Sequence, residues 1–198
     1  MSVSPSPQEL LAAIRARDEE ALALLWKAWA GKVRLFARLQ LAPCGAEADP
    51  LAQEVTVDVF HDLWRDPERF DGRVAFGTWL LAVARHKAID RLRQRAVRQR
   101  HETDLDGAGI DPADEAPGPA DQLDAQQHRA GLLHCLRRLR NGLQREALLL
   151  WALEDMPLAE IARIQQCAEN TVKTRLFHGR GNLRTCMDRW LGRSSPPV

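Results

Sequence analysis

Cationic, hydroxyl and aromatic side chains recur at helical spacing near the C-terminal end of the sequence, where together they could hold a DNA backbone and contact base edges. The outward-facing set is Thr174, His178 and Gly181, flanked by Lys173, Phe177 and Arg180. The opposite, apolar set is Val172, Leu176 and Leu183. Spacings of four and seven residues are those of an amphipathic helix, so we expect a helix that begins near Ala168 or Glu169.

A shorter helix precedes this one and completes a two-helix unit. It is expected over about Pro157–Gln165, with Ile161, Ala162 and Ile164 as apolar positions and Pro157 in the first turn, where a missing N–H costs nothing. Two short helices joined by a tight turn, with a cationic outer face on the second, match the helix-turn-helix, whose second helix enters the major groove. On this segment alone, an ordinary helical hairpin with a solvated polar face is the alternative.

The charge distribution also favours a nucleic-acid partner. The formal net charge is only +1, but it averages segments of opposite sign. Positions 85–100 hold seven Lys or Arg residues against one carboxylate, Asp90, whereas positions 102–124 hold eight carboxylates and no Lys or Arg. A basic stripe attracts phosphates whatever the total charge.

The four cysteines, Cys44, Cys135, Cys167 and Cys186, are widely spaced and include no CxxC pair. They form no recognisable zinc pattern or secreted disulfide framework, so buried, reduced thiols are expected, with a redox-sensing or metal-sensing role as the alternative. No metal or other cofactor is expected. The N-terminal MSVSPSPQELL lacks the features of a signal peptide, and no apolar run approaches the roughly 20 residues that span a bilayer. We therefore expect a cytoplasmic location.

Strong helix formers dominate and runs of alternating β-branched residues are absent, which favours an all-α chain with two small helical domains. The first domain is expected over residues 1–100. Its helices are expected at Pro7–Arg15, Glu19–Leu41, about Leu51–Arg65 and about Gly77–Arg100, with a turn at Pro43–Pro50 and a loop at 66–76.

The second domain is separated from the first by a segment of different composition. Residues 101–122 combine Pro, Gly and Asp with few large apolar side chains, so we expect a flexible acidic linker. The second domain is expected over residues 123–198. It should have helices at Ala125–Arg140 and Leu143–Glu154 before the helix-turn-helix, and a short tail at Gly192–Val198.

The last helix of the first domain carries a second surface suited to nucleic acid. Its buried positions are expected to be Leu81, Ala84, Ala88 and Leu92, and its opposite positions Trp79, Val83, His86 and Asp90, with Lys87, Arg91 and Arg93 alongside. A Trp beside cations can stack on an unpaired base while the cations hold the backbone. The alternative is that Trp79 belongs to the core and that the arginines are solvated.

The loop before that helix is a weaker candidate site. Arg69–Phe76, with Phe70, Asp71 and Phe76, could form a pocket for an extruded base.

The helix expected at Leu51–Arg65 presents an acidic stripe. Glu54, Asp58 and His61 follow one another at i, i+4 and i+7, away from the apolar seam. That seam is Leu51, Val55, Val59 and Leu63. The stripe is either a docking surface for a basic protein partner or a solvated acidic face, and spacing does not decide between them.

Taken together, these segments resemble the extracytoplasmic-function (ECF) sigma factors, the smallest class of bacterial sigma-70-like transcription initiation factors. The resemblance covers roughly Asp18–Arg95 and Leu132–Arg184. The string VTVDVFHDLWRDPERFDGRVAFGTWLLAVARHKAIDRLRQR is similar to the family's region 2, in which an acidic helix leads into F-x-x-W-L-x-x-I-A-R-N-x-A-I-D-x-L-R. The string LQREALLLWALEDMPLAEIARIQQCAENTVKTRLFHGRGNLR is similar to region 4, with E-I-A, T-V-K-x-R-L and R-x-x-L-R.

The resemblance implies an alternative sigma factor that binds the β′ and β subunits of core RNA polymerase, recognises the −10 and −35 promoter elements and promotes initiation without being an enzyme. The residues it implies for polymerase binding are Glu54, Asp58 and His61. Those implied for the −10 element are Phe70, Asp71, Phe76, Trp79, Arg85, His86, Lys87, Asp90 and Arg91. Those implied for the −35 element are Thr171, Lys173, Thr174, Arg175, Phe177, His178 and Arg180. It also implies an anti-sigma factor as partner, no direct membrane insertion, and a linker that passes through the polymerase.

Several positions depart from the family pattern. His86 replaces the usual Asn, Val57 lies where Gln is common, and Gln166 replaces a Gly often found in the turn. Left-handed geometry costs a non-Gly residue about 1–2 kcal/mol, so the turn should be slightly strained or reshaped. Gly179 and Gly181 inside the second helix should each weaken its second half by ~1 kcal/mol relative to Ala.

Two other classes of protein stay open on the residues alone. One is a stand-alone helix-turn-helix regulator that binds DNA without polymerase, against which the region 2-like string argues. The other is a small all-α enzyme or metal-binding protein that uses the His and Cys residues. Their scatter argues against it, as does the absence of GxSxG, G-x-x-x-x-G-K-[ST] and HExxH signatures.

Overall fold

The computed structural model of the chain describes residues 5–102 and 123–194, and every regular element in those two ranges is helical. The all-α prediction is confirmed. The chain divides into two compact units, Met1–Ile110 and Asp111–Val198. Most of the expected acidic linker, residues 103–122, lies outside the described residues. Among the described helices, none is both long enough and apolar enough to cross a membrane.

Within residues 5–102, the elements of unit 1 are α1 (Pro7–Arg15), α2 (Glu19–Gln40), η1 (Ala42–Glu47), α3 (Ala48–Arg65), η2 (Pro67–Arg69) and α4 (Phe76–Glu102), η1 and η2 being short 3-10 helices. The first helices begin at side-chain caps. The Ser6 hydroxyl accepts from the Glu9 N–H while the Glu9 carboxylate accepts from the Ser6 N–H, and Asp18 caps α2 in a similar way. Such caps satisfy amides that a helix start otherwise leaves unpaired.

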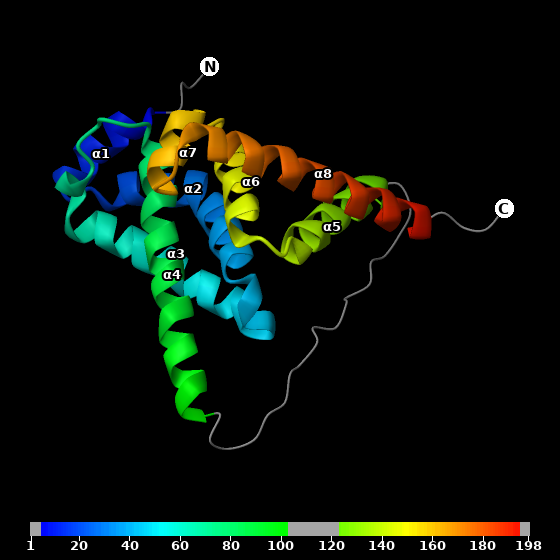
Figure 1. Ribbon diagram of the computed structural model, residues 1–198. Helices are drawn as coiled ribbons and strands as arrows, with labels where there is room; N and C mark the ends of the chain where they lie inside the picture. The colour runs from blue at the N-terminus through cyan, green and yellow to red at the C-terminus, as the bar shows by residue number, and fades with distance from the viewer. Residues whose placement is uncertain (1–4, 103–122, 195–198) are drawn as a thin grey trace. The chain divides into compact units, whose positions relative to one another are not determined.

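The core of unit 1 forms around α2, which packs against α1, α3 and α4 (Figure 1). The buried side chains at its centre include Leu25, Val33 and Phe36 of α2, Val55, Val59 and Leu63 of α3, and Leu80, Leu81, Ala84 and Ala88 of α4. The predicted seams of α3 and α4 are therefore confirmed, although Leu51 and Leu92 are only half-buried. Helix α3 begins at Ala48 rather than Leu51, because Pro50 is tolerated in the first turn of a helix.

Within residues 123–194, the helices of unit 2 are α5 (Leu123–Arg138), α6 (Gly142–Glu154), α7 (Leu158–Ile164) and α8 (Glu169–Ser194). Helix α8 organises the unit, since α5, α6 and α7 each pack against it (Figure 1). The buried side chains include Leu136, Leu148, Leu150, Met156, Ile161, Val172 and Leu176.

Helix α8 is longer than the sequence pattern indicated. It continues to Ser194, so the expected tail at Gly192–Val198 is wrong for residues 192–194. The last turns of α8 have a partner, because Trp190 packs against Gly131 and His134 of α5. The second half of α8 is thus part of the fold of unit 2.

The two glycines inside α8 have different surroundings. Gly179 is buried, and a Cβ there would lie 2.9 Å from Leu148 Cδ1 and 3.3 Å from its Cγ. A Cβ on Gly181 would meet nothing within 4 Å. Gly179 therefore permits the close approach of α8 to α6, whereas Gly181 brings only the lower helix propensity of glycine.

Candidate nucleic-acid interface

The turn between α7 and α8 depends on one residue in the left-handed conformation. Gln166 has a φ of 50°. The Cys167 N–H donates to the Ala162 carbonyl at 3.0 Å and the Gln166 N–H to the Arg163 carbonyl at 3.3 Å, which is the bonding of a Schellman helix end. The turn keeps the geometry that usually takes glycine, so of the two expected alternatives the strained one is confirmed.

A buried polar network behind this turn joins α7 and α8 to α6. Gln165 and Glu146 are only 7% and 3% exposed. The Gln165 amide donates to the Leu143 carbonyl at 2.9 Å and to the Glu146 carboxylate at 3.0 Å, and its oxygen accepts from Arg175 at 2.7 Å. Arg175 also lies 3.2 Å from the sulfur of Cys167. The sequence pattern missed Gln165 and Glu146, because polar side chains of this kind are usually exposed.

The outer face of α8 displays most of the residues predicted to contact the −35 element. Lys173, Thr174, Phe177, His178 and Arg180 are all exposed. Phe177 is 75% exposed, which is unusual for a large aromatic side chain. Thr171 and Arg175 are half-buried, and the Arg175 guanidinium has the internal partners described above. The two-faced character of the helix is confirmed, since Val172 and Leu176 are buried on the opposite side.

Trp151, near the end of α6, extends this face. It is 39% exposed, and the Arg180 guanidinium lies 4.2 Å from the centre of its ring. Trp151, Lys173, Phe177 and Arg180 line one surface hollow of unit 2. An aromatic floor with cations at its rim can hold a sugar–phosphate backbone or an apolar protein side chain.

In unit 1, a ladder of ion pairs connects α4 to α3 and to the end of η1, at intervals of about one helical turn along α4. Lys87 lies 2.8 Å from Asp62, Arg91 lies 2.9 Å from Asp58 and 3.5 Å from Glu54, and Arg95 pairs with Glu47. Arg91, a cation predicted to contact the −10 element, thus pairs with the acidic stripe predicted to bind polymerase, and Lys87 pairs with the neighbouring Asp62. The carboxylates remain partly accessible, since the side chains of Glu54 and Asp58 are 54% and 43% exposed.

Asp62 is the centre of the most crowded part of this ladder, and sequence analysis did not single it out. Besides Lys87, the carboxylate has Arg69 at 3.5 Å, Arg65 at 3.9 Å and His61 at 4.0 Å. The hydrogen bond from the Lys87 ammonium lowers the pKa of Asp62 against the opposing effect of burial, and the nearby arginines act in the same direction as Lys87. Its position four residues after Asp58 and eight after Glu54, at helical spacing, was the available signal.

The aromatic residues predicted near the −10 element form a cluster. The ring of Phe70 lies 5.5 Å from those of Phe76 and Trp79, and Phe76 lies 5.4 Å from Trp29 of α2. Phe70 and Phe76 are each 6% exposed, and Trp79 is half-buried. The expected exposed position of Trp79 is therefore only partly correct, because one side of its ring packs in the cluster.

The other residues predicted for unit 1 are more accessible. His61, Asp71, His86 and Asp90 are exposed, and Arg85 is half-buried. His86 and Asp90 lie one turn apart on α4 and are exposed, whereas Lys87 and Arg91 pair with α3. Their contacts with DNA stay predictions.

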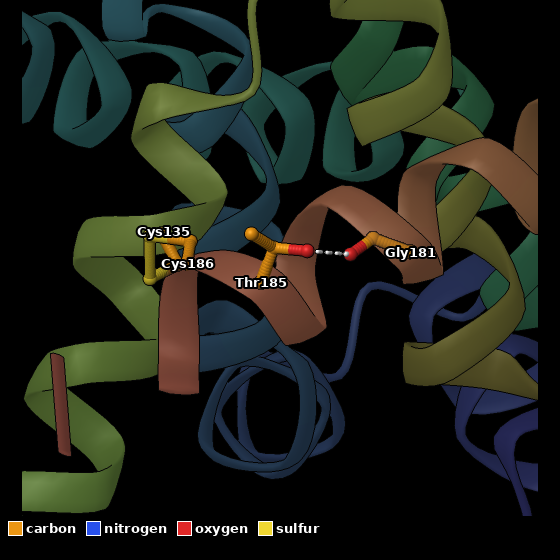
Figure 2. The surroundings of a disulfide bond; sticks show 4 residues. All are labelled: Cys135, Gly181, Thr185 and Cys186. Atoms are coloured by element: carbon orange, nitrogen blue, oxygen red, sulfur yellow. Dashed lines mark hydrogen bonds between the residues drawn. A yellow bond between two sulfur atoms is a disulfide. The ribbon is translucent and has the colours of Figure 1, made fainter. Parts of the chain in front are cut away.

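The expectation of four reduced thiols is wrong for two of them. Cys135 of α5 and Cys186 of α8 form a disulfide, with their Cα atoms 5.7 Å apart (Figure 2). They are 51 positions apart in the sequence, and no short motif marks the pairing, which arises because α5 packs along the second half of α8. Cys44 and Cys167 are free, the first buried and the second half-buried.

No metal site is indicated by the side chains of the described residues, which bring together no group of three His, Cys, Asp or Glu residues suited to hold an ion. The expectation that the chain uses no cofactor stays a prediction.

Comparison with known families assigns both units. The sigma-70 region 2 model matches residues 25–98 and the sigma-70 region 4 model matches residues 129–183. The chain belongs to the ECF sigma factors of the sigma-70 family, with a region 2 domain and a region 4 domain. It is thus a transcription initiation factor with a DNA-binding helix-turn-helix in region 4. Because this family is non-enzymatic, membership itself supports the expectation that the chain is not an enzyme.

Individual relatives agree with this assignment. ECF RNA polymerase sigma factor SigK of Mycobacterium tuberculosis (strain H37Ra) is 28% identical over 138 residues, which cover 69% of this chain and 72% of the relative. SigK of Mycobacterium sp. (strain JLS) is 26% identical over 179 residues, 90% of this chain and 89% of the relative.

Two solved structures share the fold. RpoE of Bartonella quintana, solved with the anti-sigma factor NepR, matches with a TM-score of 0.61 and 24% identity over 91% of this chain and 95% of that one. CnrH, solved with the cytosolic domain of CnrY, matches with a TM-score of 0.55 and 20% identity over 91% of this chain and 96% of that one.

Proposed function

We propose that this sigma factor binds core RNA polymerase in the cytoplasm, recognises the −10 element with unit 1 and the −35 element with unit 2, and is controlled by an anti-sigma factor. The observation that carries the proposal is the outer face of α8. There Lys173, Phe177 and Arg180 are exposed on a helix that is fixed from behind by buried Val172 and Leu176. A helix of this kind can enter a major groove, with cations for phosphates and donors for base edges.

The residues of this face divide into two roles. Lys173, Thr174, His178 and Arg180 are accessible and are the candidates for direct contact with bases or phosphates. Arg175 is better suited to a positioning role, because its guanidinium is bonded to Gln165 under the turn. The angle at which α8 meets DNA then depends on this internal bond.

For the −10 element, the aromatic cluster supports a stacking surface at the start of α4. We infer that Phe70 and Phe76 hold Trp79 from behind, so that its accessible side receives an unpaired base. His86 and Asp90 lie further along α4 and are exposed to the continuing strand.

For the polymerase, the stripe on α3 supports a protein interface. Glu54, Asp58 and His61 lie on one helix face with Val57, which is 51% exposed. Carboxylates around an accessible apolar side chain suit contact with a basic protein surface and repel DNA. A basic partner that binds Glu54 and Asp58 competes with Arg91 for these carboxylates. Polymerase binding at α3 is therefore coupled to the −10 surface of α4, to which Arg91 belongs.

The proposal of an anti-sigma factor is supported by RpoE, which was solved in complex with the anti-sigma factor NepR. Both units have accessible large apolar side chains that a protein inhibitor could cover. Among the described residues they are Leu24, Trp26, Val57 and Val97 in unit 1, and Leu132, Leu143, Trp151 and Phe177 in unit 2.

A transcription assay tests the proposal. Sigma-free core polymerase, with and without the full chain, is given a pool of templates whose upstream sequence is random. We expect transcripts only with the chain, from templates that share two sequence elements. A folded chain that produces no such enrichment contradicts the proposed recognition of a promoter.

A further inference from the structure

The ring of Trp151 lies against a cation from a neighbouring helix. Trp151 is in the last turn of α6 and is 39% exposed. The guanidinium carbon of Arg180, on α8, lies over this ring at 4.2 Å from its centre. A cation within about 6 Å of the centre of an aromatic ring is attracted to the electron-rich face. The two side chains therefore form a cation–π pair between α6 and α8.

The pair lies next to a close approach of the two helices. A Cβ on Gly179 would lie 2.9 Å from Cδ1 of Leu148, so the absence of a side chain at Gly179 lets α8 approach α6. Trp151 follows Leu148 by three residues on the same face of α6, and Arg180 follows Gly179 directly. The glycine on α8 thus brings the ring on α6 within reach of the next side chain along α8.

Stacking leaves the hydrogen-bond donors of Arg180 available. A guanidinium is planar, with five N–H groups directed outward in its plane, and stacking occupies only its face. Among the residues that the structure describes, no carboxylate forms an ion pair with Arg180. Arg175 on the same helix differs, because its guanidinium donates to Gln165 at 2.7 Å. Arg180 is therefore held by a contact that does not occupy its donors.

The surface hollow around the pair suits an anion. It is lined by three Lys or Arg residues against one carboxylate, Asp155. The cations lie on α8 in one stripe with Phe177, at spacings of four, three and four residues: Lys173, Phe177, Arg180 and Arg184. A surplus of positive charge around an aromatic floor attracts phosphate groups.

The position of Arg180 along α8 favours a phosphate over a base as its target. In a helix-turn-helix, the N-terminal residues of the second helix contact base edges. Arg180 is seven residues after Lys173, which places it roughly 10 Å further along the helix axis. A guanidinium at that distance is expected at the edge of the groove, where two of its N–H groups can bind one phosphate.

We propose that Trp151 is a positioning residue for DNA binding, whose ring holds the guanidinium of Arg180 where it donates to a backbone phosphate of the −35 element. The proposal rests on the proposed function of the outer face of α8. Because stacking restricts the Arg180 side chain before DNA is bound, binding costs less conformational entropy than it would with a mobile arginine. The ring itself needs no contact with DNA.

A double-mutant cycle on the full chain tests this role. W151L removes the ring and keeps an apolar side chain, and R180A removes the cation. Fluorescence anisotropy at several salt concentrations measures the affinity for a duplex that carries the −35 element found in the transcription assay. W151L should weaken binding about twofold to tenfold, the range expected from fixing one long side chain, and should have no further effect in R180A. The salt dependence of R180A should fall by about one phosphate contact.

Two control variants and one measurement without DNA separate positioning from structural support. W151F keeps an aromatic face and should bind within about twofold of the parent chain. R184A removes the next cation of the stripe, so its effect and that of W151L should add. In the free protein, the Trp151 ring should shift the NMR signals of the Arg180 δ-protons upfield, and W151L should abolish this shift. A weaker fold alone would make W151L equally harmful with and without Arg180.

The measurements distinguish the ways in which the proposal could fail. Additive effects of W151L and R180A would overturn the positioning role of Trp151, and the absence of a ring-current shift would overturn the pair itself. An unchanged affinity and salt dependence of R180A would overturn the phosphate contact. A parent chain that binds no such duplex would contradict the proposed function, and the phosphate contact with it, while the shift in the free protein would still report on the pair.

Discussion

Arg91 on α4 donates a hydrogen bond to Asp58 on α3 across 2.9 Å, so a cation on the helix predicted to meet the −10 element is paired with a carboxylate on the helix predicted to bind polymerase. Both groups remain partly accessible, with side-chain exposures of 29% and 43%. An accessible pair of this kind contributes about 0–1 kcal/mol to folding, so it can be exchanged for an intermolecular pair at little cost. Polymerase binding through Asp58 would then leave Arg91 free for DNA phosphates.

Neutralising the acidic stripe should weaken polymerase binding while leaving the fold intact. E54Q/D58N removes the charges that a basic partner would contact and changes the side-chain shapes little. We expect the affinity for core polymerase to fall about tenfold or more, with a loss of stability below about 1 kcal/mol. D49N is the matched control, because Asp49 pairs with Arg34 at a different part of α3. If E54Q/D58N and D49N bound core polymerase with equal affinity, the acidic stripe would not be part of the polymerase interface.

Asp62 should make unit 1 sensitive to acid. Its pKa in the folded protein is lowered by Lys87 from an unfolded value of about 3.9. The stabilisation is therefore fully present above the unfolded pKa and is lost as the pH falls through the lower, folded pKa. We expect D62N to be less stable than the parent chain at pH 7, and we expect this difference to be lost as the pH falls through the lowered, folded pKa of Asp62. Urea unfolding of both proteins across this range is the measurement, and parallel stability curves would contradict the assigned role of Asp62.

The two glycines of α8 should respond in opposite ways to the same substitution. G181A adds a methyl group into open space within a helix, so unit 2 should gain about 0.5–1 kcal/mol. G179A gains the same propensity but pushes into Leu148, which is only 5% exposed, and should lose about 1 kcal/mol or more overall. Denaturant unfolding of the pair provides the comparison. If the two alanine variants proved equally stable, the close approach of α8 to α6 would not depend on Gly179.

The left-handed turn residue offers a stabilising change. Gln166 is exposed and has a φ of 50°, where glycine has no penalty from a Cβ. Q166G should stabilise unit 2 by about 1 kcal/mol, measured by thermal unfolding, without disturbing the Gln165–Arg175 bond. Q165G serves as the contrasting variant and should be strongly destabilising, because it removes a buried hydrogen-bond partner of Glu146 and Arg175.

Direct contact with DNA should depend on the exposed cations of α8. K173A should weaken binding to the −35 element by about 1–3 kcal/mol if Lys173 contacts a base, and less if it contacts phosphate. R129A is a suitable control, since Arg129 is an exposed cation of unit 2 on α5. Fluorescence anisotropy with a selected duplex measures both, and an unchanged affinity for K173A would exclude Lys173 from the interface.

Local signals made much of the fold predictable. α1 has its predicted bounds because Pro7 marks its first turn and the polar residues Arg17 and Asp18 separate it from α2. The seam of α4 was predictable because Leu81, Ala84 and Ala88 follow the helical period. In the same way, alternation between buried Val172 and Leu176 and exposed Lys173 and Phe177 identified the outer face of α8.

What could not be predicted depends on side chains brought together from distant elements. The Cys135–Cys186 bond and the Trp190–Gly131 contact require α5 to lie along α8, which no local pattern specifies. The buried amide of Gln165, at the end of α7, donates a hydrogen bond to Glu146 of α6. Asp62 of α3 gains its shortest ion pair only because Lys87 of α4 faces it. Tertiary contacts of this kind decide burial after local preferences have set the helices.

Co-elution of the purified full chain with sigma-free core RNA polymerase on a sizing column measures the proposed polymerase binding itself. We expect a stable complex that survives the column and is lost or weakened with E54Q/D58N but not with D49N. A folded chain, free of any inhibitor, that elutes apart from the polymerase would show that the chain does not bind core polymerase.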